Sequence, residues 1–293
     1  MNETGSTELP LKLFKKGKVR DVYEVDGNLL IISTDRISAF DYVLPSLIPG
    51  KGIVLNRIAA FWFDYTKDFF PNHVVCAEPE KLPQFKEFSA QIQGRSLLAK
   101  KVETYPIEAI VRGYIVGSGW KTYQKSGEIC GIELAPGLEF AQEFPEPLFT
   151  PTTKEDEGHD ENITFAEMQD RIGSEDAKKI RDLSIELYKK VRQAAREKGV
   201  IIADTKFEFG KDEQGNIILI DEIFTPDSSR FWKVADYKQG EDPPAFDKQF
   251  VRNYLLDSSW DRNSPPPLLP PEVVEKTKEK YSEIYEILTG NTL

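Results

Sequence analysis

A segment of strictly alternating residues near position 205 constrains the fold of this chain more than any other feature. In residues 203–210, the charged side chains of Asp204, Lys206 and Glu208 alternate with threonine and phenylalanine. Successive side chains of a β-strand point to opposite faces, so these three charges share one face. An apolar run precedes the segment and a second one follows at 217–220, which indicates a hairpin that passes through the interior. We therefore expect its charges to line a cleft, because buried acids are costly without a cation or metal beside them.

The composition indicates a globular cytoplasmic protein that binds small molecules. The chain has 293 residues, 40% of them hydrophobic, which is enough for two lobes with cores of their own. It lacks a run of about 20 apolar residues and a signal-peptide pattern, so we expect a cytoplasmic location. A net charge of −11 argues against binding to nucleic acid or an anionic membrane, although it allows a local cationic pocket. Cys76 and Cys130 are expected to be free thiols, and no obligatory protein partner is predicted.

The first hundred residues predict an antiparallel meander that one helix interrupts. Strands are expected at 19–25, 29–34 and 96–103, and the dipeptide Asp26–Gly27 suits a tight turn between the first two. Apolar residues at helical spacing indicate a helix at about 55–68.

A proline after Tyr105 predicts a boundary between two lobes. Proline has no amide donor and a fixed φ angle, which suits a hinge better than a central strand. We expect an N-terminal antiparallel β lobe at 1–105 and an α+β lobe at 106–264. A Pro-rich connector and a C-terminal helix are expected at 265–293.

Two helices are predicted after a long irregular segment. Residues 134–162 are rich in proline, glycine and acids, and are expected to form a long loop that is either functional or disordered. Thr164 and Glu167 have the spacing of a capping box, and Ser174 starts a second helix whose apolar stripe ends before Gly199.

A basic turn near the start is a candidate phosphate-binding element. The chain contains neither a P-loop nor a dinucleotide fingerprint. Lys16, Gly17 and Lys18 precede a predicted strand, and a glycine flanked by cations can lay amide and ammonium groups over a polyphosphate. The alternative is a solvated basic turn.

The last strand of the meander and the segment after it offer further candidates. Lys100 and Lys101 alternate to opposite faces of an apolar strand, so one of them can point inward to an anion, as in kinase-like nucleotide sites. Equally, both can protect an edge strand. Glu108 can accept a hydrogen bond from a ribose hydroxyl or face water.

Two arginines are candidate anion-binding groups. Arg112 ends a strand before a glycine-rich turn that contains Ser118, and Arg230 follows a polar stretch. A guanidinium group offers a planar fork that suits phosphate, and the serine can complete the cup. The alternative is a glycine turn with a surface arginine.

Two carboxylates on the predicted hairpin form the best metal-site candidate. Glu208 and Asp221 lie on paired strands, and Mg²⁺ takes one or two carboxylates and completes its shell with phosphate oxygens and water. His159, between acidic neighbours, is a second option, but adjacent residues rarely all face one ion. Residues 208–210 are similar to the Asp-Phe-Gly motif of protein kinases, yet the expected His-Arg-Asp loop is absent.

Six blocks of sequence resemble the SAICAR synthetase (phosphoribosylaminoimidazole-succinocarboxamide synthase) family. They occur in the family's order over about residues 12–235, at 17–23, 33–41, 108–118, 153–160, 204–210 and 221–230. The length and the Pro-rich C-terminal extension resemble the longer, yeast-like members.

The resemblance implies both a fold and a reaction. The fold is α+β, with a kinase-like antiparallel N-terminal lobe and an ATP-grasp-like C-terminal lobe. The reaction joins L-aspartate to carboxyaminoimidazole ribonucleotide with ATP and Mg²⁺, and gives SAICAR, ADP and phosphate in purine biosynthesis. Transfer of the γ-phosphoryl group makes an acyl phosphate, from which the aspartate amine then displaces phosphate. The alternative is a small-molecule kinase that shares the same ATP cleft.

The resemblance also implies roles for the matching positions, although it assigns none to aspartate binding. The implied ATP-binding residues are Lys16, Gly17, Lys18, Lys101, Thr104, Glu108 and Lys154. The implied metal ligands are Glu208 and Asp221. The implied substrate-binding residues are Ser38, Asp41, Arg112, Ser118, Asp227, Ser228 and Arg230. Asp204 and Lys206 are the implied catalytic residues, facing the imidazole and the carboxylate of the ribonucleotide.

Overall fold

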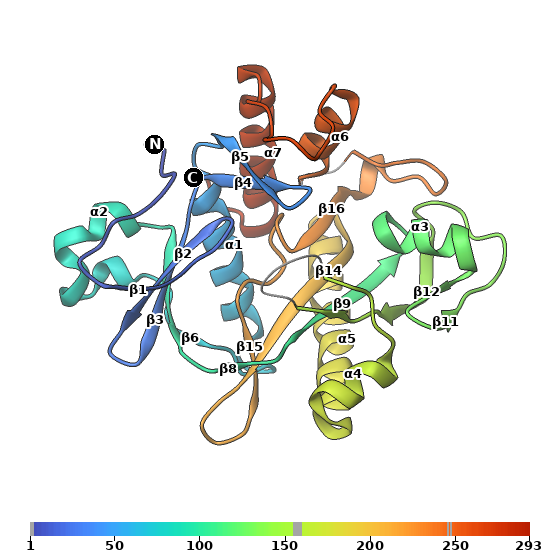
Figure 1. Cartoon of the computed structure of the whole chain (residues 1–293), viewed down its shortest axis with the longest axis horizontal. Coiled ribbons are helices and arrows are strands. Elements are labelled where there is room, and N and C mark those ends of the chain that lie inside the picture. Colours follow the sequence, from blue (N-terminus) through green and yellow to red (C-terminus); the bar gives the residue numbers. More distant parts are fainter. Residues whose placement is uncertain (1–2, 155–159, 245, 247) are drawn as a thin grey trace.

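The chain folds into two large antiparallel sheets with helices packed against them (Figure 1). The structure, a computed structural model, describes residues 3–154, 160–244, 246 and 248–293. The predicted α+β class is confirmed. Across these residues, no helix combines the length and apolar character needed to cross a membrane.

The N-terminal sheet has five strands and matches the predicted meander. In sheet order they are β1 (Lys12–Lys16), β2 (Arg20–Val25), β3 (Asn28–Ser33), β7 (Ser96–Lys100) and β6 (Val74–Cys76). The same region contains the hairpin β4 (Arg36–Ala39) and β5 (Tyr42–Leu47), the helices α1 (Lys51–Thr66) and α2 (Ser89–Ile92), and 3₁₀ turns at Pro79–Lys81 and Pro83–Phe88. Cys76 and Cys130 are free, as predicted.

Helix α1 begins four residues before the predicted start. The prediction relied on apolar residues at helical spacing, and the first turn contains the charged residue Lys51. That lysine is nevertheless fully buried, where it forms an ion pair with Asp227. The helix packs on β3 and on the C-terminal helix α7 (Pro271–Thr289).

The second sheet has seven strands, centred on β14 (Val200–Lys211). β14 is the strictly alternating strand, and it pairs with β15 (Ile217–Ile220) as predicted. The other strands are β8 (Glu103–Thr104), β9 (Ile107–Tyr114), β12 (Glu143–Phe149), β13 (Thr152–Thr153) and β16 (Ser229–Lys233). The helices α4 (Phe165–Ile172) and α5 (Ser174–Glu197) cover one face of this sheet (Figure 1).

The expectation of irregular structure throughout 134–162 was wrong in part. Strand β12 lies within this segment and pairs with β9 at the edge of the sheet. An edge strand tolerates Pro145 and Pro147, because one side of its backbone needs no partner. The capping box predicted at Thr164 is present and starts α4.

The remaining elements lie around the two sheets. They are α3 (Gly117–Ser126), β10 (Glu128–Ile129), β11 (Ile132–Glu133), a 3₁₀ turn at Val234–Asp236, and α6 (Gln249–Asp257) beside α7. The predicted C-terminal helix is thus confirmed as α7. One apolar cluster includes side chains of α1, β9, β14 and α7. The lobe boundary at 105/106 stays a prediction.

Replacing Gly113 with alanine is expected to destabilise the protein by about 3 kcal/mol, through overpacking. Gly113 lies on β9, where a Cβ atom would be 1.9 Å from the hydroxyl oxygen of Tyr188. That tyrosine is fully buried and donates a 2.6 Å hydrogen bond to the carbonyl of Ile202, so it cannot move aside. Urea unfolding at 25 °C measures the loss.

The matched control is Gly17→Ala, where the added Cβ would lie 3.4 Å from the carbonyl oxygen of Arg20, an ordinary contact. We expect its free energy of unfolding to change by less than about 0.5 kcal/mol. Combining Gly113→Ala with Tyr188→Phe removes the nearest clashing atom and should restore part of the stability. Wild-type stability of Gly113→Ala alone would contradict the packing described for α5 and β9.

Candidate functional site

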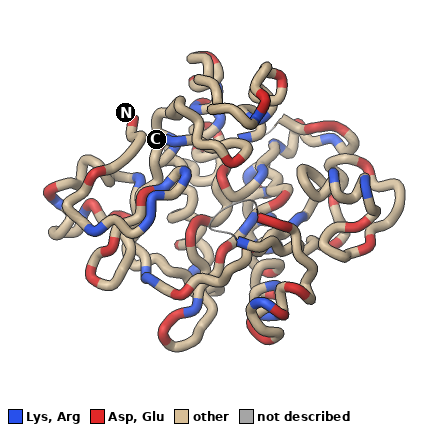
Figure 2. The backbone as a smooth tube through the Cα atoms, viewed as in Figure 1, with Lys and Arg blue, Asp and Glu red and all other residues tan. Residues whose placement is uncertain are grey.

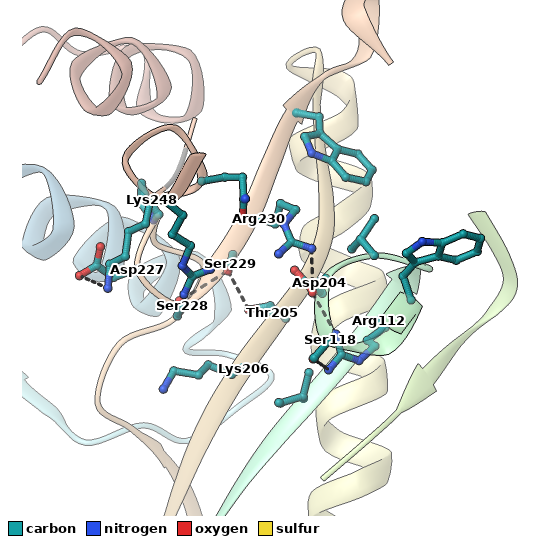
Figure 3. Close-up of a pocket in the computed structure, with 18 of the residues that line it drawn as sticks. Arg112, Ser118, Asp204, Thr205, Lys206, Asp227, Ser228, Ser229, Arg230 and Lys248 are labelled. Atoms are coloured by element: carbon teal, nitrogen blue, oxygen red, sulfur yellow. Dashed lines mark hydrogen bonds and ion pairs between the residues drawn. The ribbon is translucent and has the colours of Figure 1, made fainter. Parts of the chain in front are cut away.

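A cavity of about 770 Å³ opens between β14, the turn that leads into β16, the start of α3, and α6 (Figure 3). Eight of the predicted site residues line it: Asp41, Arg112, Ser118, Asp204, Lys206, Asp227, Ser228 and Arg230. They come from positions up to 189 residues apart between Asp41 and Arg230. The fold therefore brings most of the predicted substrate-binding residues together.

Strand register places Asp204 between the two predicted arginines. β14 pairs with β9 on one side and with β16 on the other, so that Asp204 lies opposite both Arg112 and Arg230. Its Oδ2 atom accepts from Nη1 of Arg112 at 3.1 Å and from Nη1 of Arg230 at 3.5 Å (Figure 3). Two guanidinium groups thus meet at one carboxylate, and both are forked donors that suit an anion.

The arginine side chains are held in place by further contacts. Arg112 is only 4% exposed, and it donates to the hydroxyls of Ser118 at 3.2 Å and Thr150 at 3.0 Å. Burial lowers the pKa of Arg112, and the nearby Arg230 adds to this, while Asp204 opposes it. Gly117 has a φ of +56°, which favours glycine, and an added Cβ would lie 2.9 Å from the guanidinium of Arg230.

A second group of charges continues along the same face of β14. Lys206 donates to Glu108, and Lys154 donates to Glu208. Burial alone would lower the pKa of Lys206, but Glu108 and Glu208 outweigh it and raise that pKa. Lys206 therefore stays protonated, on the strand between Asp204 in the cavity and Glu208.

Glu208 and Asp221, the predicted metal ligands, interact with each other electrostatically, and their binding of a metal stays a prediction. Burial raises the pKa of Glu208, and the neighbouring Asp221 raises it further. Burial would also raise the pKa of Asp221, but Arg20 and Lys154 outweigh it and the pKa is lowered. Two partly buried acids that repel each other and lie beside two cations suit a divalent ion in the same place. Within the described ranges, no group of three potential ligands occurs, so phosphate oxygens and water would complete the shell.

The basic turn near the N-terminus is held in place by Arg36, which was not predicted from the sequence. Arg36 donates to the backbone carbonyls of Gly17 and Lys18, each at 2.9 Å, and to Asp21 at 2.9 Å. Lys18 pairs with Asp41 at 2.6 Å, which joins this turn to the cavity wall. Lys16, at the end of β1, is exposed.

The other predicted ATP-binding residues lie apart from the cavity. Lys101 pairs with Glu24 and lies 4.7 Å from the ring centroid of Phe14. Thr104 lies opposite Gly210 across β8 and β14. Their proposed contacts with ATP stay predictions.

Two further predicted positions lie elsewhere. Ser38 lies opposite Val43 in the β4–β5 hairpin, outside the residues that line the cavity. His159 lies outside the described residues.

Several charged residues of the site were not predicted. Arg20 contacts Asp221 and donates to Glu222 at 2.7 Å, although it lies in a block that carried the family resemblance. Lys248 and Arg252 line the cavity, and only their spacing of four residues on a helix could have signalled them. That spacing is common on solvent-facing helices, so it carries little information.

Charge is distributed unevenly between the cavity and the rest of the molecule. Acidic residues occur throughout the chain, in keeping with the net charge of −11 (Figure 2). Among the residues that the structure describes, more cations than acids line the cavity. The cations are Arg112, Lys121, Lys206, Arg230, Lys248 and Arg252, and the acids are Asp41, Asp204, Asp227 and Asp242.

Comparisons with known proteins agree on one family. The family model described as SAICAR synthetase matches residues 13–267. A protein of Thermodesulfovibrio yellowstonii, named phosphoribosylaminoimidazole-succinocarboxamide synthase, is 53% identical over 284 residues, which cover 96% of each chain. One of the same name from Syntrophobacter fumaroxidans is 49% identical over 290 residues, 98% of this chain and 96% of the relative.

Solved structures give the same answer for the fold. The SAICAR synthase of Saccharomyces cerevisiae, described in complex with SAICAR, is 44% identical, covers 99% of both chains and has a TM-score of 0.89. A SAICAR synthetase described in complex with ADP is 26% identical with a TM-score of 0.71, over 95% of this chain and 98% of that one.

Proposed function

The chain belongs to the SAICAR synthetase family, and on that premise we propose which of its residues carry each part of the reaction. It is an ATP-dependent ligase that condenses L-aspartate with carboxyaminoimidazole ribonucleotide in purine biosynthesis. The alternative of a small-molecule kinase is not favoured, because relatives over nearly the whole chain carry the ligase name.

The observation that supports the residue roles best is the order of charges along β14. Asp204, Lys206 and Glu208 follow one another on one face, and a strand rises about 3.4 Å per residue. Asp204 and Lys206 are therefore about 7 Å apart along the strand, and Glu208 lies about 7 Å beyond Lys206. We propose that the ribonucleotide lies along this row.

At one end of the row, Arg112, Arg230 and Ser118 bind the ribonucleotide phosphate. The guanidinium groups offer forked donors, and Asp204 aligns both of them. In the middle of the row, Lys206 contacts the reacting carboxylate and keeps its positive charge there. Holding anionic reactants together against their mutual repulsion is the main task of such a site.

The reaction then proceeds in two displacements. An oxygen of the ribonucleotide carboxylate bonds to the γ-phosphorus of ATP and ADP leaves, which gives an acyl phosphate. The aspartate amine bonds to the acyl carbon, phosphate leaves with the bridging oxygen, and the amine loses a proton. Lys206 offsets negative charge in both steps. Glu208 and Asp221 would hold Mg²⁺, which screens the phosphate charges when bound.

The N-terminal turn at Lys16, Gly17 and Lys18 is proposed to cover the ATP phosphates. Its support is the clamp from Arg36 and the link from Lys18 to Asp41. Lys101, Thr104, Glu108 and Lys154 are proposed to surround the nucleotide. We also infer a cytoplasmic location, since ATP is consumed and both cysteines are free thiols, which suits a reducing compartment.

An assay of ADP release tests the proposed function. With ATP, Mg²⁺, the ribonucleotide and aspartate, we expect steady release. Omission of any one component should lower it at least about a hundredfold, because the acyl phosphate turns over only when the amine displaces phosphate. ADP release at the full rate without aspartate would indicate a kinase and contradict the ligase assignment.

A further inference from the structure

Helix α6 gives the cavity a second cationic wall. Of the six cations in the lining, three are proposed above to meet the phosphate and the reacting carboxylate of the ribonucleotide. Two of the others, Lys248 and Arg252, come from the start of α6. Figure 3 shows Lys248 and Asp227 to one side of Ser228 and Ser229, and Arg230 to the other side.

Lys248 is a largely buried cation that shares its nearest carboxylate with a second lysine. Its side chain is only 13% exposed, and its Nζ atom lies 3.1 Å from Oδ2 of Asp227. The same oxygen accepts from Lys51 at 2.8 Å, and Oδ1 accepts from the hydroxyl of Tyr281 at 2.9 Å. One carboxylate thus faces two buried ammonium groups. Burial lowers the pKa of Lys248 and the nearby Lys51 adds to this, while Asp227 and Glu222 oppose it.

Arg252 adds a second cation one helical turn further on. The amide of Arg252 donates to the carbonyl of Lys248 at 2.8 Å, so the two residues are stacked at i and i+4 on the same face of the helix. Like charges at this spacing repel each other. Over the residues that the structure describes, Arg252 forms no ion pair, and both side chains line the same cavity. An anion between them would remove the repulsion.

We propose that Lys248 and Arg252 form the subsite that binds the two carboxylates of the amino-acid substrate. This inference rests on the proposed function, because it takes aspartate as the third reactant. The other anionic groups already have partners, with arginines for the phosphate and Lys206 for the reacting carboxylate. A dicarboxylate is the remaining reactant, and two cations a turn apart match its two charges.

Lys51 and Tyr281 are positioning residues for this subsite. They hold Asp227 from the N-terminal region and from α7, and Asp227 in turn fixes the ammonium group of Lys248. Because Asp227 is occupied by these contacts, we assign it to the support of Lys248 rather than to direct substrate binding.

Steady-state kinetics with each substrate varied in turn tests the proposal. Lys248→Gln and Arg252→Gln should each raise KM for aspartate at least about tenfold, with KM for ATP and for the ribonucleotide changed less than about threefold. Tyr281→Phe should raise KM for aspartate about threefold at an unchanged kcat. The matched control is Lys278→Gln, a surface lysine of α7 paired with Glu275, which should change none of these constants.

Calorimetric titration with succinate provides a readout that needs no turnover. Succinate has both carboxylates but no amine, and either α6 variant should weaken its binding about tenfold or more. Arg252 is only half-buried, so its variant keeps the test valid even if Lys248→Gln does not fold.

Two results would overturn the subsite. One is wild-type succinate affinity and aspartate KM in Arg252→Gln. The other is a rise confined to KM for the ribonucleotide, which would place these cations on the other substrate. ADP release by the wild-type enzyme at the full rate without aspartate would instead refute the proposed function.

Discussion

Glu208→Gln is expected to lower kcat by roughly a hundredfold to a thousandfold and to raise the Mg²⁺ concentration needed for half-maximal activity. The substitution keeps the size of the side chain but removes one of the two buried carboxylates at the end of the β14 row. The remaining Asp221 already contacts Arg20, so by itself it should bind a divalent ion more weakly than the two carboxylates together. Initial rates over a Mg²⁺ titration measure both effects.

The control for this variant is Glu213→Gln, at the exposed tip of the same hairpin. It removes the same charge from the same β14–β15 unit and should leave kcat and the Mg²⁺ dependence unchanged. Thermal unfolding of both variants separates loss of function from loss of fold. A Glu208→Gln enzyme with wild-type rate and Mg²⁺ dependence would remove Glu208 from the metal site.

Arg112→Ala and Arg230→Ala are each expected to raise KM for the ribonucleotide about 10- to 150-fold. The range corresponds to the roughly 1.5–3 kcal/mol that a hydrogen bond to a charged group contributes. Each variant removes one of the two guanidinium groups that Asp204 holds at one end of the cavity. Steady-state kinetics at saturating ATP and aspartate measures the change.

Conservative variants sharpen this prediction. Arg112→Lys and Arg230→Lys keep the charge but lose the planar fork, so most of the affinity should still be lost. The matched control is Arg192→Ala on α5, where the arginine pairs with Glu143 away from the cavity. Unchanged ribonucleotide KM in both alanine variants would show that this end of the cavity does not bind the phosphate.

The alternating strand could be predicted from the sequence because its information is local. The period of two placed Asp204, Lys206 and Glu208 on one face, and the apolar runs indicated a hairpin that reaches Asp221. The capping box at Thr164 and the C-terminal helix were predictable for the same reason.

The partners of that strand could not be predicted from local patterns. Asp204 meets Arg112 and Arg230 only because β14 pairs with β9 and β16, which are separated from each other along the chain by more than a hundred residues. The roles of the two arginines beside Asp204 were implied by the family resemblance, whereas the alternating pattern predicted only that Asp204, Lys206 and Glu208 share a face.

Long-range ion pairs were invisible for a similar reason. Lys51 pairs with Asp227 across 176 residues, and Arg20 contacts Asp221 across 201. Buried polar residues of this kind also interrupt the apolar pattern, which is why the start of α1 was placed too late.

Transfer of ¹⁸O from substrate to phosphate tests the central claim most directly. That claim is that the site activates the ribonucleotide carboxylate by phosphoryl transfer before the amine attacks. With both carboxylate oxygens labelled, one ¹⁸O should appear in the released inorganic phosphate and the other in the amide of the product. The label in the released phosphate is measured by mass spectrometry. Phosphate that contains no ¹⁸O, with product formed at the normal rate, would contradict the claim.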